Sequence, residues 1–107
     1  MPIIDVSGLT TEEKDVKNKL RREIQKYFAK KLGIKEDSTA VTFITDDTIT
    51  DQEHIIARLH SKSFMKMGQE ELDEISDDVV AILEEAGHPY NEAFPIPVMA
   101  MRGRFLK

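Results

Sequence analysis

The sequence predicts an α/β fold, a two-layer sandwich in which two helices cover one face of a four-stranded mixed sheet. Two observations predict it: apolar residues recur at helical spacing in two segments, and short β-rich segments surround them in the order β-α-β-β-α-β. Elements of this kind bury their apolar sides by stacking helices against a sheet. The chain has 107 residues, a usual size for one domain, so we expect a single domain spanning residues 1–107.

The first half of the chain predicts a strand followed by a long helix. The strand covers residues 2–6 and ends at a Ser7-Gly8 turn. The helix is expected to begin at Thr10, because Glu13 follows at the spacing of a capping box, and to end at Gly33. Its apolar stripe consists of Val16, Leu20, Ile24, Tyr27, Phe28 and Leu32.

The second half predicts two strands, a helix and a last extended segment. We expect strands over residues 40–45 and 55–64, separated by a polar loop at 46–53. The second strand places Arg58, His60 and Lys62 on one face and Ala57, Leu59, Ser61 and Ser63 on the other. After a connection at 65–68, a helical stripe runs to Gly87 and consists of Leu72, Ile75, Val79, Ile82, Leu83 and Ala86.

The last extended segment, residues 94–101, contains Pro95 and Pro97. Prolines two apart remove donors from the same lateral edge of a strand, so that edge is expected to be unpaired there, or paired only beyond the prolines. The helices cover one face of the sheet, while the other face also has apolar residues. We therefore expect subunits to pack against that second face in a symmetric ring.

Composition excludes several classes of function. A net charge of −5 argues against general nucleic-acid binding, and no segment is long and apolar enough to span a membrane. A chain without cysteine has no disulfide, thiolate nucleophile or cysteine-based metal site, which fits a reducing compartment, and we expect the cytoplasm. His54, His60 and His88 lack ligand spacing, so we expect no metal site and interpret His60 as structural.

Pro2, directly after Met1, is the residue with the clearest chemical potential. Removal of Met1 would leave Pro2 as a free secondary amine. An α-amino group has a pKa near ~7.7–8.0, and burial or a nearby cation lowers it, because both disfavour the charged form. The result would be a neutral base able to abstract a proton beside a carbonyl. In the alternative interpretation, Pro2 is incidental and only permits removal of Met1.

The Met1-Pro2 start, the Ile3-Ile4 strand and the β-α-β-β-α-β order resemble the tautomerase superfamily over essentially the whole chain. The resemblance is to its longer members, in the migration-inhibitory-factor and hydroxymuconate-isomerase branches. Local similarity covers residues 29–33, running through Lys35 into 40–41, and residues 59–62. The resemblance implies a homotrimer in which the amino-terminal proline catalyses keto–enol isomerisation of a small 2-oxo acid or related carbonyl compound, without metal or organic cofactor.

The resemblance extends to few other site residues. Lys35 lies near the position of a family active-site lysine, and Ser61 and Lys62 match residues that border the family pocket. These three would bind substrate, although both lysines also fit solvated surface residues. Residues 7–10 and 40–45 lack the arginines that family members have there. Residues 94–97 lack the family's tyrosine and asparagine. These differences put in doubt that the substrates known for the family are substrates of this chain. The candidates for the missing cation, from the same or a neighbouring subunit, are Arg58, Arg102 and Arg104.

Two other functions remain open. The same order of elements occurs in ferredoxin-like binding modules, including RNA-recognition domains. Those domains stack bases on exposed aromatic residues of the central strands, whereas residues 55–64 offer only Phe64. The second alternative is a tautomerase-fold trimer without meaningful turnover that acts as a binding or scaffold protein, since fold does not determine function.

Overall fold

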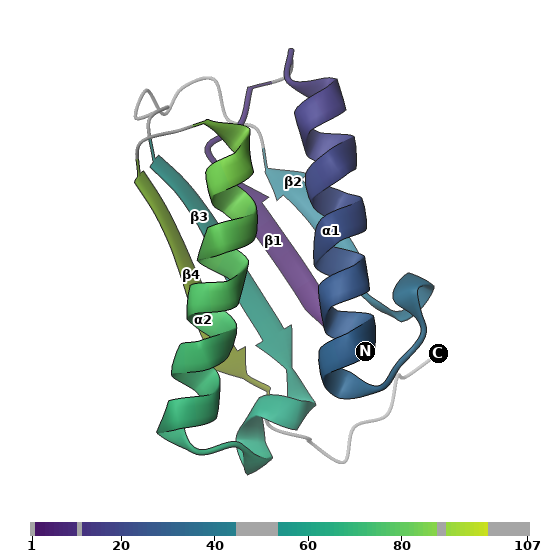
Figure 1. The fold of residues 1–107 in the computed structure, drawn as a ribbon, viewed down its shortest axis with the longest axis vertical. Helices are drawn as coiled ribbons and strands as arrows, with labels where there is room; N and C mark the ends of the chain where they lie inside the picture. The colour runs from purple at the N-terminus through teal and green to yellow at the C-terminus, as the bar shows by residue number, and fades with distance from the viewer. Residues whose placement is uncertain (1, 11, 45–53, 88–89, 99–107) are drawn as a thin grey trace, which may run out of the picture.

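The computed structural model describes residues 2–10, 12–44, 54–87 and 90–98. Helices α1 (Lys14–Leu32) and α2 (Gln69–Leu83) lie side by side on one face of a four-stranded sheet (Figure 1). The strands are β1 (Ile3–Ser7), β2 (Ala40–Ile44), β3 (His54–Ser61) and β4 (Tyr90–Pro97). Short 3₁₀ helices are η1 (Glu36–Ser38), η2 (Lys62–Lys66) and η3 (Glu84–Ala86). The predicted two-layer α/β fold and its order of elements are confirmed.

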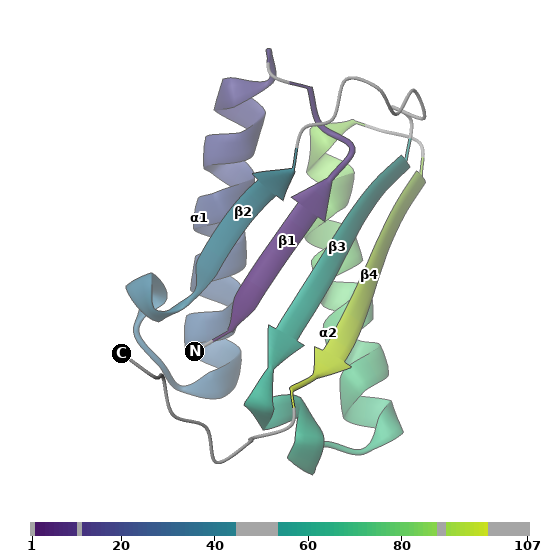
Figure 2. The same ribbon diagram turned by 180° about the vertical axis from the view of Figure 1, so that it is seen from behind.

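The sheet joins two β-α-β units at its centre. Its strand order is β2-β1-β3-β4, with β1 parallel to β2, β3 parallel to β4, and β1 antiparallel to β3. Each parallel pair is connected through one helix, and crossovers of one hand place both helices on the same side. The opposite face of the sheet has no helix of the described chain over it (Figure 2).

The core lies between the sheet and the helices. Alternation along the strands turns every second side chain toward the helices, and these side chains are fully buried: Ile4, Val6, Ile55, Ala57 and Leu59. The helices meet them with the stripes that helical spacing predicts, whose buried members are Leu20, Ile24, Phe28, Ile75, Val79 and Leu83. Burial of these apolar groups is the main term that stabilises the fold.

The two helices also make polar contacts with each other. The Tyr27 hydroxyl donates a hydrogen bond to Asp78 Oδ2 at 2.8 Å. Burial raises the pKa of Tyr27, and the hydrogen bond to Asp78 acts in the same direction. Lys31 Nζ lies 3.2 Å from Glu74 Oε1 across the same junction. The basic surface of α1 therefore meets part of the acidic surface of α2.

In the described residues, three glycines have a positive φ where an element ends: Gly8, Gly33 and Gly87. Gly33 has φ of 68° after α1, and its N–H donates to the Ala29 carbonyl, which confirms the predicted end of the helix. Gly8 has φ of 109° after β1, and a Cβ added there would overlap the carbonyl of His54. Gly8 is therefore required both by its φ and by the close approach of β3.

Helix α1 begins at Lys14, later than predicted. The Glu13 carboxylate accepts hydrogen bonds from the backbone N–H and the hydroxyl of Thr10, both at 3.0 Å. The expected Thr10–Glu13 contact therefore exists, but it closes a turn that precedes the helix. The residue before the helix is Glu13, and its side chain makes no capping hydrogen bond to the first turn.

Two strand boundaries also differ from prediction. Strand β3 ends at Ser61, because the Ser61 hydroxyl accepts the N–H of Ser63 at 3.2 Å and starts η2. Lys62 therefore lies on a helical turn and does not continue the strand alternation. Strand β4 begins at Tyr90, before the predicted start at 94. The predicted loop at 46–53, His88, the strand residues 99–101 and the tail arginines Arg102 and Arg104 lie outside the described residues.

Strand β4 forms one edge of the sheet, as its prolines predict. The Val98 N–H donates to the Ser61 carbonyl at 3.2 Å, so this N–H points toward β3. Successive backbone N–H groups of a strand alternate in direction, and the nitrogens of Pro95 and Pro97 therefore point away from β3. Neither proline interrupts the pairing between β3 and β4.

The helix-free face of the sheet is mixed in character. Its exposed apolar side chains include Ile3, 46% exposed, and Phe94, 49% exposed. Charged groups lie between them, among them Asp5 and His60, whose Oδ2 and Nε2 atoms are 3.4 Å apart. Subunit packing against this face stays a prediction. Within the described parts of the chain, neither helix is long and apolar enough to cross a membrane.

Candidate functional site

Among the described residues, the only two buried polar side chains lie at one end of the sheet. Thr39 is 1% exposed and Ser61 is 3% exposed. The strand registers place both beside Pro2: Ile3 pairs with Ala40 and with His60, so one residue earlier Pro2 faces Thr39 on the β2 side and Ser61 on the β3 side. We call these three residues the Pro2 row.

The side chains of the Pro2 row lie on the helix-facing side of the sheet. Pro2 is buried and precedes the buried Ile4 by two residues, so alternation turns its ring toward the helices. The Pro2 carbonyl accepts a hydrogen bond from the Ala40 N–H at 3.0 Å, which continues the parallel pairing of β1 with β2. The ring is therefore held next to the core, between two hydroxyl-bearing residues.

The two hydroxyls of the row differ in their hydrogen bonding. Ser61 Oγ accepts the Ser63 N–H, and the Ser61 carbonyl accepts the Val98 N–H. The Thr39 carbonyl accepts a hydrogen bond from Gln25 Nε2 at 3.0 Å. Its hydroxyl, however, has no partner among the residues that the structure describes. Buried hydroxyls are hydrogen-bonded in the great majority of native proteins, so this group is unusual.

Lys35 and Lys62 lie at the same end of the sheet as the Pro2 row. Lys35 is exposed and directly precedes η1, which leads into Thr39 and β2. Lys62 is exposed and directly follows Ser61 as the first residue of η2. Lys35 is thus four residues before Thr39 in the chain, and Lys62 is directly after Ser61, so each outer residue of the Pro2 row has a lysine close to it in sequence. Two such cations suit an anionic ligand, although both remain solvated in a single subunit.

Arg58 does not join this group within one subunit. It lies on the helix-free face of β3, opposite to the face of Ser61, and three residues along a strand correspond to about 10 Å. Its Nη1 donates a hydrogen bond to Ser7 Oγ at 3.4 Å. The structure therefore gathers Pro2, Ser61, Lys35 and Lys62 at one end of the sheet and leaves Arg58 on the outer face.

Thr39 is the residue that sequence reasoning missed. A signal existed: Val41 and Phe43 face the core, and counting back two residues places Thr39 on the same side. Its importance follows only from the pairing of β1 with β2, which brings it beside Pro2. No group of three or more carboxylate, imidazole or thiol side chains suited to a metal ion occurs in the described ranges.

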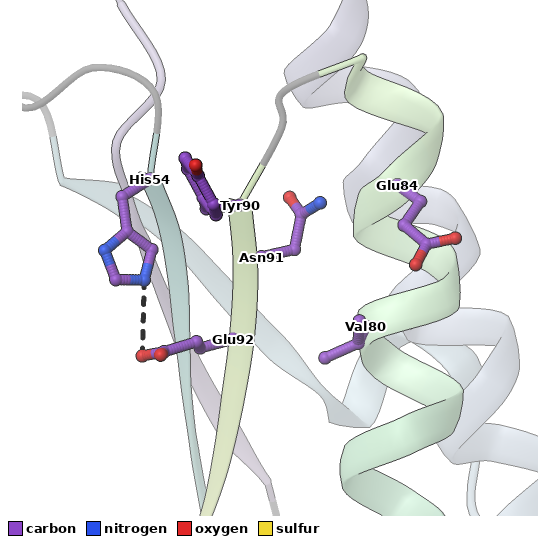
Figure 3. Close-up of a pocket in the computed structure, with 6 residues that line it drawn as sticks. All are labelled: His54, Val80, Glu84, Tyr90, Asn91 and Glu92. Carbon is purple, nitrogen blue, oxygen red and sulfur yellow. Dashed lines mark ion pairs between the residues drawn. The ribbon is translucent and has the colours of Figure 1, made fainter.

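A concave region lies at the opposite end of the sheet from the Pro2 row, where β3 and β4 begin. It is a hollow of about 370 Å³ between β4 and the end of α2 (Figure 3). His54 Nε2 and Glu92 Oε2 are 3.2 Å apart there. We call it the acidic hollow; its lining residues are His54, Val80, Glu84, Tyr90, Asn91 and Glu92. None of the site residues predicted from the sequence lines it.

Solved structures share this fold. A protein of unknown function from Vibrio cholerae O1 biovar eltor is similar with a TM-score of 0.75 and 8% identity, over 97% of this chain and 83% of that chain. Leishmania major MIF2 is similar with a TM-score of 0.62 and 14% identity, over 96% and 95% of the two chains. N1, a member of the cis-3-chloroacrylic acid dehalogenase family, is similar with a TM-score of 0.57 and 15% identity, over 98% and 83%.

These similarities extend over most of each chain and assign the fold. The migration-inhibitory-factor and dehalogenase-family structures have the tautomerase-superfamily fold, so the chain has a tautomerase-like fold. Identities this low show shared architecture and leave chemistry to the site residues. No protein-family model matches the chain, and no curated protein matches it.

Proposed function

We propose that this protein is a cofactor-independent tautomerase or isomerase in which Pro2, freed by removal of Met1, is the general base. The substrate is a small 2-oxo acid or a related carbonyl compound. The observation that supports this most directly is the position of Pro2: it is buried at the start of the central strand β1, between two buried hydroxyl-bearing residues, in a tautomerase-like fold.

The proposed reaction is a proton transfer from carbon to oxygen. The neutral Pro2 nitrogen removes a proton from the carbon beside the carbonyl, which breaks a C–H bond and leaves an enolate and a secondary ammonium group. The ammonium then returns the proton to the enolate oxygen and the enol forms. Burial disfavours the charged amine and lowers its pKa, so that the nitrogen is unprotonated near neutral pH.

Lys35 and Lys62 would hold the substrate carboxylate and stabilise the negative charge that develops on oxygen, with Ser61 bordering the site. Arg58 fits this role only if the proposed homotrimer brings it to the Pro2 row of a neighbouring subunit, because in its own subunit it lies on the outer face. We further propose that residues 1–107 form one catalytic domain and that the protein works in the cytoplasm.

The experiment starts with the intact mass, which establishes whether Met1 is absent. Mature protein is then mixed with pyruvate, phenylpyruvate and oxaloacetate in D₂O, and exchange of the proton beside the carbonyl is followed by NMR. We expect catalysed exchange that falls about 100-fold or more in Pro2→Ala, the usual scale for losing a general base. Pro95→Ala, the same change on strand β4, should keep the exchange rate. Equal rates for both variants would refute Pro2 as the base.

The second candidate function is a trimeric binding or scaffold protein without turnover. The exposed apolar side chains on the helix-free face, including Ile3 and Phe94, favour an assembly role, and Arg58 lies away from the Pro2 row. The same assay separates the two functions, because a scaffold catalyses no exchange with any probe. Mass measurement by light scattering tests the trimer independently of the chemistry.

A further inference from the structure

We infer that Thr39 is a positioning residue for the Pro2 amine. In the chain without Met1, the Pro2 N–H donates a hydrogen bond to Thr39 Oγ1, which leaves the nitrogen lone pair directed at the substrate. This inference rests on the proposed function of Pro2. It gives the buried hydroxyl beside Pro2 a partner and a role.

A buried hydroxyl without a partner supports this contact. Thr39 is 1% exposed, and its Oγ1 has no hydrogen-bond partner in the described part of the chain. Leaving a buried polar group unpaired is unfavourable, since the group loses water without gaining another contact. A valine would fill the same volume without that loss. The hydroxyl therefore points to a partner that forms when the amino terminus is processed.

The position of Thr39 in the sheet supports the contact as well. Its backbone is extended, with φ of −100° and ψ of 121°, so the side-chain alternation of β2 continues back to it. The parallel register places it directly beside Pro2, on the same helix-facing side of the sheet. Neighbouring strands are about 5 Å apart, which brings the two residues within reach of each other.

Removal of Met1 changes the chemistry of the Pro2 nitrogen. With Met1 attached, the Pro2 nitrogen is a tertiary amide and has no hydrogen to donate. Without Met1 it is a secondary amine with one N–H and one lone pair. Of the two hydroxyls in the row, Ser61 Oγ already accepts the Ser63 N–H, whereas Thr39 Oγ1 is available. Thr39 can therefore accept the new N–H.

This contact has an electrostatic consequence. A hydrogen bond from the protonated amine to Thr39 Oγ1 is stronger than one from the neutral amine, so Thr39 raises the pKa of Pro2 relative to a variant without the hydroxyl. The charged groups on η1, on η2 and directly before η1 are Lys35, Glu36, Asp37, Lys62 and Lys66, all exposed. They are the same in every Thr39 variant, so their influence cancels in the comparison.

The test uses protein shown by intact mass to lack Met1 and labelled with ¹⁵N and ¹³C in proline. The titration of Pro2 is followed by NMR in wild type, Thr39→Val and Thr39→Ser. We expect the midpoint to fall by about one pH unit in Thr39→Val and to return in Thr39→Ser. Thr42→Val, the same change at an exposed position of β2, should leave the midpoint unchanged.

Kinetics supply the second readout. With whichever 2-oxo acid is turned over, kcat should fall about tenfold in Thr39→Val with little change in KM, and Thr39→Ser should restore it. If Thr39→Val does not fold, Thr39→Ala removes the same hydroxyl and takes its place. A Pro2 midpoint that is equal in wild type and the hydroxyl-free variant would overturn the inference.

Failure of the proposed function is a separate result. If no probe is turned over, or Pro2→Ala keeps full activity, Pro2 is not a base for these substrates. The NMR titration still reports whether Thr39 contacts the Pro2 amine, because it needs no substrate. A changed midpoint without turnover therefore supports the contact and removes only the catalytic role.

Discussion

The two ends of the sheet differ in how far their polar side chains are buried. At the Pro2 row, two hydroxyl-bearing residues are buried, Thr39 at 1% and Ser61 at 3% exposure. At the acidic hollow, Glu84, Tyr90 and Glu92 are exposed, with Tyr90 at 63%, whereas His54 and Asn91 are half-buried. The ion pair there joins side chains of His54 and Glu92 that are 29% and 48% exposed (Figure 3).

This difference in burial determines how strongly a polar group affects the stability of the fold. Exposed ion pairs contribute about 0–1 kcal/mol, because solvent screens them and both side chains lose freedom. A buried hydroxyl without a partner costs about 1–3 kcal/mol. Proteins depart from the rule that buried polar groups are hydrogen-bonded mainly at functional sites. The Thr39 hydroxyl of the Pro2 row is such a departure. We therefore take the Pro2 row, and not the acidic hollow, as the candidate site.

The largest effect on stability is expected next to the acidic hollow, at Gly8. Its positive φ and the nearby His54 carbonyl leave no room for a Cβ. We expect Gly8→Ala to lower the free energy of unfolding by about 3 kcal/mol or more, measured by urea denaturation. Gly33→Ala is the matched control: its φ is also positive, but the space around it is open, so about 1 kcal/mol should be lost. Equal losses would contradict the close approach.

An intermediate effect is expected within the Pro2 row. Ser61→Ala removes the acceptor of the Ser63 N–H and so the contact that turns the end of β3 into η2. The free energy of unfolding should fall by about 1 kcal/mol, measured as a lower melting temperature. Ser63→Ala keeps the backbone donor at an exposed position and should change stability by less than about 0.5 kcal/mol. A larger effect at Ser63 would show that the buried hydroxyl is not the stabilising group.

The smallest effect is expected in the acidic hollow itself. Glu92→Gln removes one charge of the pair with His54 while keeping the shape of the side chain. Stability at neutral pH should change by less than about 0.5 kcal/mol, no more than in Glu71→Gln on the exposed first turn of α2. Turnover should be unchanged in both variants. Loss of turnover in Glu92→Gln alone would move the candidate site to the hollow.

The fold was predictable because its signals are local. The helix stripes, such as Leu20 with Ile24, follow from spacing alone, and Gly33 ends α1 for reasons contained in its own backbone. The predictions missed element boundaries that local side-chain contacts determine. The expected Thr10–Glu13 contact forms but closes a turn before α1, and Ser61 ends β3 by accepting the N–H of Ser63. Such choices depend on competition between local contacts that the pattern does not resolve.

The candidate site was predictable only in part. Pro2 was identifiable from its chemistry, and its role stays a prediction together with those of Lys35, Ser61, Lys62 and Arg58. For Thr39, alternation from Val41 and Phe43 indicates only which side of the sheet it faces, because its position beside Pro2 depends on pairing between strands that are far apart in sequence. Residue type indicates the chemistry that a side chain can perform, whereas the pairing register of the strands determines which residues become its neighbours.

The proline-bearing edge of β4 limits how this sheet can grow. Where Pro95 and Pro97 point outward, the backbone offers carbonyl acceptors but no donors, so an extra strand from another molecule finds no continuous ladder to join. Open sheet edges are common starting points for aggregation, and prolines are one way in which proteins block them. Replacing both prolines would therefore be expected to make the protein less soluble without changing its fold.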